Sequence, residues 1–369
     1  MAKRVFILGA GASLHAGAPL MNSFLDKARD LQPRLQNHRY IDAAKLVFKA
    51  ISSLQHVHSK SELDLFNLES LFTTFEMATT LGQLADLEEN EIAKLVEALQ
   101  TVIVFTLDYS MGFPVSRTGT EGFIASGAYR RLSDKIYNFL QERSSVAIIT
   151  FNYDVAVELA LHYTGRQFSY CLDGSQPQQD VIPLLKLHGS INWGATDSAP
   201  NAPIVECPIA WLDNAEYCQD CLMRSIEPHS QSFSLNVGSR FFDYLRRSGH
   251  NDVREAPVIV PPGMYKTEYQ NSLAHVWKAA ARELADAEYI YVAGYSLPAT
   301  DFFFHNLYAL GTVSPTILRR FSVIDTNPKI EGRFKSLLGP GARDRFQEPY
   351  LRGFEDAMQG TEMNPKFWE

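Results

Sequence analysis

Short runs of apolar residues recur along the chain, and each is bounded by turn residues and followed by a helical pattern. Such runs are typical of strands in a parallel sheet that helices cover on both faces. Six runs are predicted to be strands: Arg4–Leu8, Val146–Phe151, Leu184–Leu187, Pro257–Val260, Tyr289–Ala293 and Phe321–Asp325. The pattern therefore predicts an α/β fold with a doubly wound, mostly parallel (Rossmann-like) sheet.

Two stretches interrupt this alternation of strand and helix. Between the first two predicted strands the apolar positions fit helices over 41–54, 63–80, 87–107 and 128–142. A later stretch is rich in Pro, Asn and Ser and has little sustained period. We expect one domain over 1–335, with a helical insertion over about 30–143 and a small loop-rich module over about 190–255. A C-terminal surface tail over 336–369 is expected to hold one short helical piece near 351–358.

Composition and charge narrow the class of protein. The chain has 369 residues, of which 46% are hydrophobic and 21% charged, so it can bury a full core and is not a disordered chain. The formal net charge of −8 argues against a nucleic-acid surface as the main function. Nine acids against two bases between residues 60 and 100 supply most of that charge. Because they fall in the helical insertion, we expect them to serve partners or self-association, away from the chemistry.

Cysteine usage and hydropathy bear on location and metal binding. Four cysteines are too few for a disulfide framework, so a reducing cytoplasm is expected. Cys218 and Cys221 have the spacing of a metal-binding pair, which Cys207 and His229 could complete as a zinc site. The spacing is irregular, so zinc is not favoured, no metal ligand is assigned, and the thiols are otherwise ordinary residues. No apolar run approaches the roughly 18 residues of a membrane helix, and no membrane association is expected.

A glycine-rich loop follows the first predicted strand. It reads Gly9-Ala10-Gly11-Ala12-Ser13 and is expected to open a helix. Glycines at such a turn let the backbone approach a pyrophosphate, whose charge meets amides at the positive end of the helix. The dinucleotide fingerprint has a third glycine where this chain has Leu14, and no Lys-Ser/Thr pair follows to make a Walker-type ATP site. The alternative is a tight turn that binds no ligand.

Polar residues follow four other predicted strands. They are Asn152-Tyr153-Asp154, His188-Gly189-Ser190, Gly294-Tyr295-Ser296-Leu297-Pro298 and Asp325-Thr326-Asn327-Pro328. Ligands of open α/β sheets bind at the carboxyl ends of the strands, so these residues are expected to converge on one crevice. Each has a structural alternative. His188 could be a core histidine and Asp325 a turn residue, while Asn152 and Asp154 could cap the following helix. These alternatives explain poorly why four strands end this way beside a glycine loop.

Three of these motifs, in this order, resemble motifs of the sirtuins. They are Gly9-Ala10-Gly11-Ala12-Ser13 with Gly17-Ala18-Pro19, Thr150-Phe151-Asn152-Tyr153-Asp154, and Leu187-His188-Gly189-Ser190. The sirtuin motifs read roughly Gly-Ala-Gly-x-Ser with a later Gly-Ile-Pro, Thr-Gln-Asn-Ile-Asp, and His-Gly. Gly294-Tyr295-Ser296-Leu297 and Asp325-Thr326-Asn327 are similar to the adenosine-side motifs of that family. The resemblance covers residues 4 to about 330 without the helical insertion, and it implies that the chain binds NAD.

The chain departs from the protein-deacylating sirtuins. Leu20-Met21-Asn22 stands where they have Asp-Phe-Arg, and one Cys-x-x-Cys pair is present where they have two. The segment beside which their peptide substrate adds as a strand is not found. The insertion, Val260-Pro261-Pro262-Gly263 and the stretch from Gly294 to Asp301 look more like the bacterial sirtuin-like proteins of anti-phage defence, which destroy NAD.

The resemblance implies a role for each motif. His188 would be the general base acting on a ribose hydroxyl or water, Asn152 would orient water and the ribose, and Asp154 would accept from the nicotinamide carboxamide. The binding residues would be Gly9, Ala10, Gly11 and Ser13 at the pyrophosphate, Gly294, Ser296, Asp325 and Asn327 at the adenosine half, and Gly189. Tyr153 replaces the usual Ile.

The leading hypothesis is an NAD+ hydrolase (NADase) that cleaves the nicotinamide–ribose bond to give nicotinamide and ADP-ribose, or a cyclic form of it. The resemblance implies an effector of anti-phage defence that depletes NAD+ and is restrained until triggered. A homo-oligomer is expected, together with a regulatory partner protein such as a ring ATPase or an Argonaute-like protein. The alternatives are an NAD-dependent protein deacylase and a non-catalytic module that senses NAD or ADP-ribose. No direct binding to nucleic acid is expected.

Overall fold

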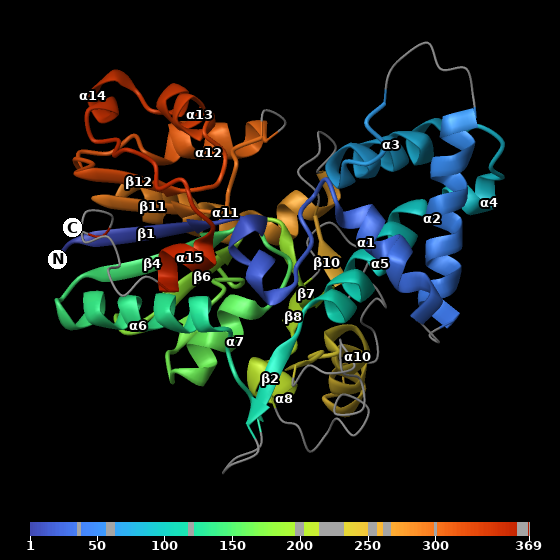
Figure 1. Ribbon diagram of the computed structural model, residues 1–369, viewed down its shortest axis with the longest axis horizontal. Coiled ribbons are helices and arrows are strands. Elements are labelled where there is room, and N and C mark those ends of the chain that lie inside the picture. The colour runs from blue at the N-terminus through green and yellow to red at the C-terminus, as the bar shows by residue number, and fades with distance from the viewer. Residues whose placement is uncertain are drawn as a thin grey trace.

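The structure is a computed structural model of the chain (Figure 1). It describes residues 1–34, 38–56, 63–116, 122–195, 203–213, 232–249, 257–260, 267–298, 301–359 and 368. Within these residues, no helix has both the length and the apolar character needed to cross a membrane.

A six-stranded sheet forms the centre of the molecule, in the order β12-β11-β1-β4-β6-β5. Its strands are β1 (Lys3–Leu8), β4 (Ser145–Thr150), β5 (Phe168–Ser169), β6 (Ile182–Lys186), β11 (Tyr289–Ala293) and β12 (Arg320–Ile324). All neighbouring pairs are parallel, with Phe6 opposite Tyr291 on one side and Ile148 on the other. Strands β4 and β6 are buried along almost their whole length, which is why they read as continuous apolar runs. The predicted Rossmann-like α/β class is confirmed.

One predicted strand belongs to a different sheet. Strand β10 (Pro257–Ile259) pairs antiparallel with β7 (Gly189–Ala195), and β7 also pairs with β8 (Ile204–Glu206). The prediction that 257–260 joins the parallel sheet was wrong, because a short buried apolar run does not reveal which sheet buries it. The sixth parallel strand is β5, whose two residues are too few to give a pattern.

Helices cover both faces of the central sheet. They include α6 (Gly127–Gln141), α7 (Ala156–Tyr163), α11 (Thr267–Ala285) and α12 (Phe302–Gly311). Side chains alternate along a strand, so Lys3 and Phe6 of β1 point to opposite faces. The Phe6 ring lies 6.4 Å from that of Phe139 on α6, whereas Lys3 forms an ion pair with Glu283 on α11. Helix α6 also packs on β4, so this helix, which the sequence placed in the insertion, belongs with the sheet.

The earlier helices gather at one end of the sheet, on the right in Figure 1. They are α1 (Phe24–Leu31), α2 (His38–His56), α3 (Leu68–Leu81), α4 (Glu89–Ile92) and α5 (Leu95–Ser110), with a 3-10 turn at Gln32–Arg34. Helix α5 lies at the centre of this group, because it contacts α1, α2 and α3 and nearly all of its residues are buried. Its apolar residues occur all round the helix, as a helix buried on every side requires.

A smaller unit contacts both α5 of this group and α7 of the central sheet. It contains β7, β8 and β10, the helices α8 (Ile209–Asp213) and α10 (Val237–Arg247), and the paired strands β2 (Phe113–Ser116), β3 (Gly122–Phe123) and β9 (Ser232–Phe233). The carboxylate of Asp108 on α5 accepts hydrogen bonds from the amides of Val237 and Gly238, at 2.9 and 2.8 Å. These amides begin α10, so a charge from α5 stabilises the positive end of that helix.

The C-terminal segment packs along the edge strand β12. It contains α13 (Ile330–Leu337), α14 (Pro340–Arg343) and α15 (Phe354–Gln359). Phe346 and Tyr350 form bridges with Phe321 and Ile324 of β12, and Trp368 is buried. The segment therefore covers a sheet edge and is not a loose tail. It also carries the chain from the edge of the sheet to the carboxyl ends of the strands.

Candidate functional site

A cavity of about 540 Å³ opens at the carboxyl ends of the parallel strands and is called the carboxyl-edge cavity below. From β1 the chain builds β4 and β6 on one side and later returns to build β11 and β12 on the other. The crevice where this order reverses is the usual ligand site of an open α/β sheet. Nine of the residues proposed from the sequence line it: Gly9, Ala10, Gly11, Asn152, His188, Gly294, Ser296, Asp325 and Asn327. The fold thus brings together residues that follow five different strands.

The glycine loop is held against the loop after β11. The amide of Gly11 donates to the carbonyl oxygen of Gly294 at 3.0 Å. Gly294 has a positive φ of 62°, and a Cβ there would lie 2.2 Å from the amide nitrogen of Ala12. A Cβ on Gly9 would lie 2.6 Å from the Gly294 oxygen. The close passage of two loops is therefore enough to require glycine at these positions, whatever the cavity binds.

The expected helix after this loop does not form. The loop continues as two 3-10 turns, Ala10–Ala12 and Leu14–Ala16, and the first α-helix begins only at Phe24. The prediction that the loop opens a helix was wrong. The left-handed Gly17 and the residues after it turn the chain away before an α-helix can form. A helix dipole therefore contributes nothing to anion binding at this loop.

Asn152 is fixed between the glycine loop and the buried interior. Its side-chain nitrogen donates to the carbonyl oxygen of Gly9 and to the Ser13 hydroxyl, both at 3.0 Å. The Ser13 hydroxyl in turn lies 2.8 Å from the hydroxyl of Tyr129 on α6. These bonds hold the amide plane of a side chain that is only 7% exposed. Ser13 itself is fully buried and does not line the cavity, so it acts on the site through Asn152.

His188 follows β6 at the floor of the cavity. Its ring meets Phe151 edge-on with centroids 5.2 Å apart, and its backbone oxygen accepts from the amide of Val260 at 2.8 Å. Gly189 has a φ of 82°, and a Cβ there would lie 2.0 Å from the oxygen of Val258. Gly189 does not line the cavity. Its glycine identity instead lets β10 pass close by and so fixes where His188 sits.

Asp154 lies outside the cavity lining. Its side chain accepts a hydrogen bond from the amide of Ala156 at 3.0 Å and so caps the start of α7. This is the structural role that the sequence allowed for it. A contact with a nicotinamide carboxamide stays a prediction carried by the resemblance alone.

A buried ion pair lies beneath the His188 turn. The Lys186 ammonium contacts Glu158 of α7 at 2.7 Å, and each side chain is only 1% exposed. The same ammonium donates to the backbone oxygen of Asp154, and the Tyr170 hydroxyl donates to Glu158 at 3.2 Å. Burial raises the pKa of the Glu158 carboxyl, and the charge of Lys186 opposes that rise. The pair connects the end of β6, two residues before His188, to the helix that Asp154 caps.

The loops after β11 and β12 form the opposite wall of the cavity. Tyr295 stacks on Phe151 with centroids 4.0 Å apart and donates to Asp301 at 2.6 Å. Asp301 also caps α12 by accepting from the amide of Phe304, so both of its oxygens are engaged. Burial raises the pKa of the Asp325 carboxyl, whose oxygen accepts from the amide of Asn327 at 2.7 Å.

Three groups of lining residues were not expected from the sequence. They are Leu20, Met21 and Asn22; Asn67 and Glu69 at the start of α3; and Arg352, Gly353 and Phe354 at the start of α15. The expectation that the acidic stretch 60–100 lies away from the crevice was wrong for Glu69. Asn67 before an apolar run does signal a helix start, but no sequence pattern shows which cavity that helix end faces.

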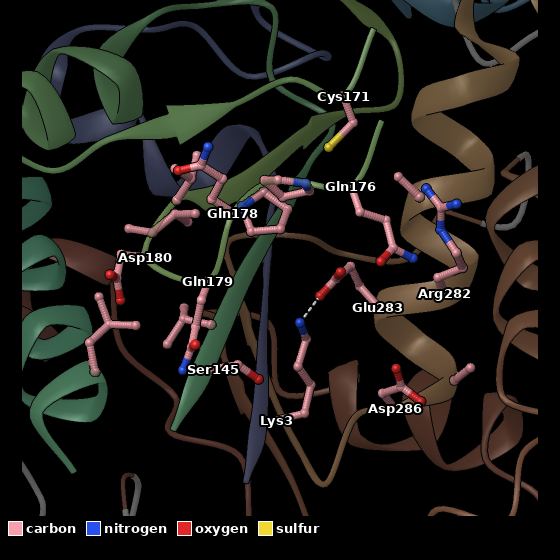
Figure 2. A pocket seen from close by; sticks show the side chains of 18 residues that line it. Lys3, Ser145, Cys171, Gln176, Gln178, Gln179, Asp180, Arg282, Glu283 and Asp286 are labelled. Atoms are coloured by element: carbon pink, nitrogen blue, oxygen red, sulfur yellow. Dashed lines mark ion pairs between the residues drawn. The ribbon is translucent and has the colours of Figure 1, made fainter. Parts of the chain in front are cut away.

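A second cavity, of about 370 Å³, lies at the amino ends of the same strands and is called the amino-edge cavity below. Figure 2 shows Lys3 at the start of β1 and Ser145 at the start of β4 facing Arg282, Glu283 and Asp286 of α11 and the loop after it. The dashed line in Figure 2 joins Lys3 to Glu283, the ion pair already described. The remaining polar lining of the amino-edge cavity comes largely from the glutamine-rich loop before β6.

The candidate zinc ligands are only partly described. Cys218, Cys221 and His229 lie outside the described residues. Cys207 is buried, and burial raises the pKa of its thiol to about 12. Among the described residues, no group of three or more His, Cys, Asp and Glu side chains could hold a metal ion.

Comparison with known proteins gives similarity at the level of solved structures. No family model matches the chain, and no curated protein matches it. A Sir2 homologue in complex with ADP-ribose is 12% identical, over 96% of this chain and 88% of that chain, with a TM-score of 0.38. Sir2 in complex with an inhibitor, 2'-O-acetyl-ADP-ribose and a deacetylated p53 peptide is 11% identical, over 99% and 94%, with a TM-score of 0.36. At these scores, the assignment of the fold rests on the strand order and register of this chain.

Proposed function

We propose that this chain is an NAD+ hydrolase that cleaves the bond between nicotinamide and ribose. The observation that carries the proposal is the convergence of His188 and Asn152 with the glycine loop in one cavity at the reversal point of the sheet. The order of the motifs along the chain and the ADP-ribose bound by the similar Sir2 homologue support it.

The strand order suggests how a dinucleotide would lie. Asp325 and Asn327 follow β12, and His188 follows β6, so they occupy opposite ends of the cavity with the glycine loop of β1 between them. We place the adenosine half near Asp325 and Asn327, the pyrophosphate over Gly9–Gly11, and the nicotinamide ribose beside Asn152 and His188.

The proposed reaction is a displacement at the anomeric carbon of that ribose. The bond from this carbon to the pyridinium nitrogen breaks, and its electron pair neutralises the ring as nicotinamide leaves. A water oxygen bonds to the same carbon and loses one proton to His188, giving ADP-ribose. Positive charge develops on the ribose as in glycoside hydrolysis, and because the leaving group departs neutral, no strong general acid is needed.

His188 and Asn152 contribute to the proposed reaction in different ways. An imidazole has an unperturbed pKa of about 6.5, so His188 suits proton transfer at neutral pH. Asn152 carries no charge and is held rigidly by Gly9 and Ser13, so its contribution is orientation of the ribose and the attacking water. Asp154 acts behind them, as the cap of α7.

Nicotinamide release from NAD+ by the purified chain tests the proposal. The wild type is expected to release nicotinamide without any acylated peptide, and His188→Ala and Asn152→Ala are expected to lower the rate of release strongly while remaining folded by circular dichroism. Release that depends on an acylated peptide would make the chain a deacylase. Binding of NAD+ without turnover over a range of protein concentrations, with candidate partners present, would make it a sensor.

The biological role is proposed from the resemblance. We propose an effector of anti-phage defence that depletes NAD+ as a homo-oligomer, regulated by a partner such as a ring ATPase or an Argonaute-like protein, in the cytoplasm and without binding nucleic acid directly. Exposed apolar side chains of the insertion, such as Leu81 at the end of α3 and Phe66 in the turn before it, at 68% and 46% exposure, support self-association there. Leu81→Glu is expected to reduce the oligomer measured by light scattering.

A further inference from the structure

The C-terminal segment forms part of the wall of the carboxyl-edge cavity. Its residues 345–350 run beside β12. The amide of Tyr350 donates to the carbonyl oxygen of Val323 at 2.8 Å, and the amide of Asp325 donates to the carbonyl oxygen of Tyr350 at 3.2 Å. The bridges of Phe346 and Tyr350 to β12 are parallel. The segment therefore continues the parallel sheet and, like the strands beside it, leads to the carboxyl edge.

The next residues of the segment cross to the glycine loop. Phe354 begins α15, lines the cavity and is only 3% exposed, and its ring centroid lies 5.9 Å from that of His15. Helix α15 also contacts the first turn of the glycine loop, Ala10–Ala12. The two ends of this crossing are thus held by contacts, Tyr350 beside Asp325 and Phe354 beside the glycine loop.

Arg352 lies midway along this crossing. Its amide donates to the carbonyl oxygen of Tyr350 at 2.8 Å, and the residue is exposed and lines the cavity. It is the one Lys or Arg among the described residues of the lining. Within the part of the chain that the structure describes, its guanidinium forms no ion pair or hydrogen bond. Arg352 is therefore a cation held between the Asp325 loop and the glycine loop, with its hydrogen-bond donors available to a ligand.

The other charges of the cavity make this cation necessary for an anionic ligand. Three carboxylates also line the cavity, those of Glu69, Asp301 and Asp325, and they would repel a pyrophosphate. The glycine loop does not offset them, because residues 9–22 include no Lys or Arg and the loop opens no α-helix whose dipole could act. Among the described residues, the positive charge for a pyrophosphate has to come from Arg352.

We propose that Arg352 binds the pyrophosphate of the dinucleotide, from the side of the cavity opposite the glycine loop. The inference rests on the proposed function and deepens it, because it assigns the C-terminal segment to the substrate site. A guanidinium can donate two parallel hydrogen bonds to phosphate oxygens, which an ammonium cannot do. The glycine loop would then offer backbone amides to one side of the pyrophosphate and Arg352 a charge to the other.

An ordering role in the Asp325 loop is the alternative for Arg352. In that case the side chain would serve Asp325, and its loss would weaken binding of the adenosine half. Arg345 provides a matched control, because it is an exposed residue of the same segment that does not line the cavity. Its carbonyl oxygen accepts from the amide of Phe321, near the start of β12. Arg352→Gln and Arg345→Gln remove the same charge, and only the first removes it from the cavity.

Binding of ADP-ribose and of adenosine to the full chain tests the inference without turnover. Calorimetry measures ADP-ribose directly, and adenosine through its competition with ADP-ribose. Arg352→Gln is expected to bind ADP-ribose about tenfold more weakly than wild type, the size expected for one charge-assisted contact, with adenosine affinity unchanged. Arg352→Lys is expected to lose about threefold, because it keeps the charge without the paired geometry. Arg345→Gln is expected to match wild type for both probes.

The outcomes separate this inference from the proposed function. If Arg352→Gln binds ADP-ribose as wild type does, or if its adenosine affinity falls by the same factor, the inference is overturned even where wild type releases nicotinamide. Failure of wild type to bind ADP-ribose would overturn it as well. If only ADP-ribose affinity falls and wild type never releases nicotinamide, Arg352 binds the pyrophosphate but the hydrolase proposal fails.

Discussion

The carboxyl-edge and amino-edge cavities lie at opposite ends of the strands of one sheet and differ in how their polar groups are used. At the amino edge, Lys3 and Glu283 pair with each other across β1 and α11 (Figure 2). At the carboxyl edge, residues from five strand ends and from an inserted helix line one space. Parallel strands all deliver their following loops to the same edge, so separate motifs can converge only there. Convergence, more than volume, therefore marks the candidate site.

The largest difference in the rate of nicotinamide release is expected between variants of two histidines, one at each edge. His188→Ala is expected to lower the rate of nicotinamide release by about 10²- to 10⁴-fold, the usual contribution of a general base. His275, on α11, packs against the loop of Gly174 at the amino edge, and His275→Ala is expected to leave the rate within about twofold of wild type, because a surface change of this kind has little effect elsewhere. Single-turnover measurements of both variants check this. Equal losses would remove the functional distinction between the edges.

The ion pairs of the two edges are expected to differ in stability rather than in rate. Lys186→Met leaves the Glu158 charge buried at 1% exposure and is expected to lower the free energy of unfolding by about 3–5 kcal/mol. Lys3→Met affects a pair whose side chains are 16% and 17% exposed, and about 1 kcal/mol is expected after allowance for solvent screening. Urea unfolding of both variants measures the difference. Similar losses would contradict the view that burial decides the cost.

The pH dependence of the Lys186→Met variant sharpens that prediction. Burial already raises the pKa of Glu158, and removing Lys186 takes away the charge that opposed the rise. A carboxyl whose folded-state pKa lies above its unfolded value of about 4.3 favours the folded state while it is protonated, and that stability is lost as pH rises through the raised pKa. The difference in free energy of unfolding between Lys186→Met and wild type is therefore expected to be larger at pH 8 than at pH 5. A gap independent of pH would show that Glu158 stays ionised without its partner.

Substitution of two glycines with positive φ, one at each edge, compares how much free energy of unfolding is lost when a Cβ is added to each loop. Gly294→Ala at the carboxyl edge places a Cβ 2.2 Å from a backbone nitrogen, whereas Gly174→Ala at the amino edge places one 2.5 Å from the side chain of His275, which can move. Both pay the cost of a left-handed residue, about 1–3 kcal/mol, and Gly294→Ala is expected to cost about 1–2 kcal/mol more. Thermal unfolding compares them. The order would be reversed if the two loops at the carboxyl edge could move apart freely.

The sequence predicts the strands of the sheet and the motifs after them better than it predicts which other segments line the cavity beside those motifs. Periodicity identifies β1, β4, β6, β11 and β12 because each is a buried run of sufficient length. It fails for 257–260, since a buried run looks the same in either sheet, and for the glycine loop, where Gly17 ends the turn before an α-helix forms. Glu69 and Arg352 reach the cavity through long-range packing of α3 and of the segment beside β12, and no local pattern carries that information.

The smallest expected effect comes from filling the amino-edge cavity. Gln179 and Ser296 are exposed residues that line the amino-edge and carboxyl-edge cavities respectively, so replacing each by tryptophan adds bulk to one cavity at a time. Ser296→Trp is expected to raise the KM for NAD+ about tenfold, equivalent to about 1.4 kcal/mol of lost binding, while kcat stays close to wild type because the proposed pose places Ser296 at the adenosine half and not at the reacting carbon. Gln179→Trp is expected to change neither constant by more than about twofold, since nothing at the amino edge contacts the proposed substrate. Steady-state kinetics of the pair decide the matter, because a KM that rises in Gln179→Trp and not in Ser296→Trp would move the nucleotide from one edge of the sheet to the other.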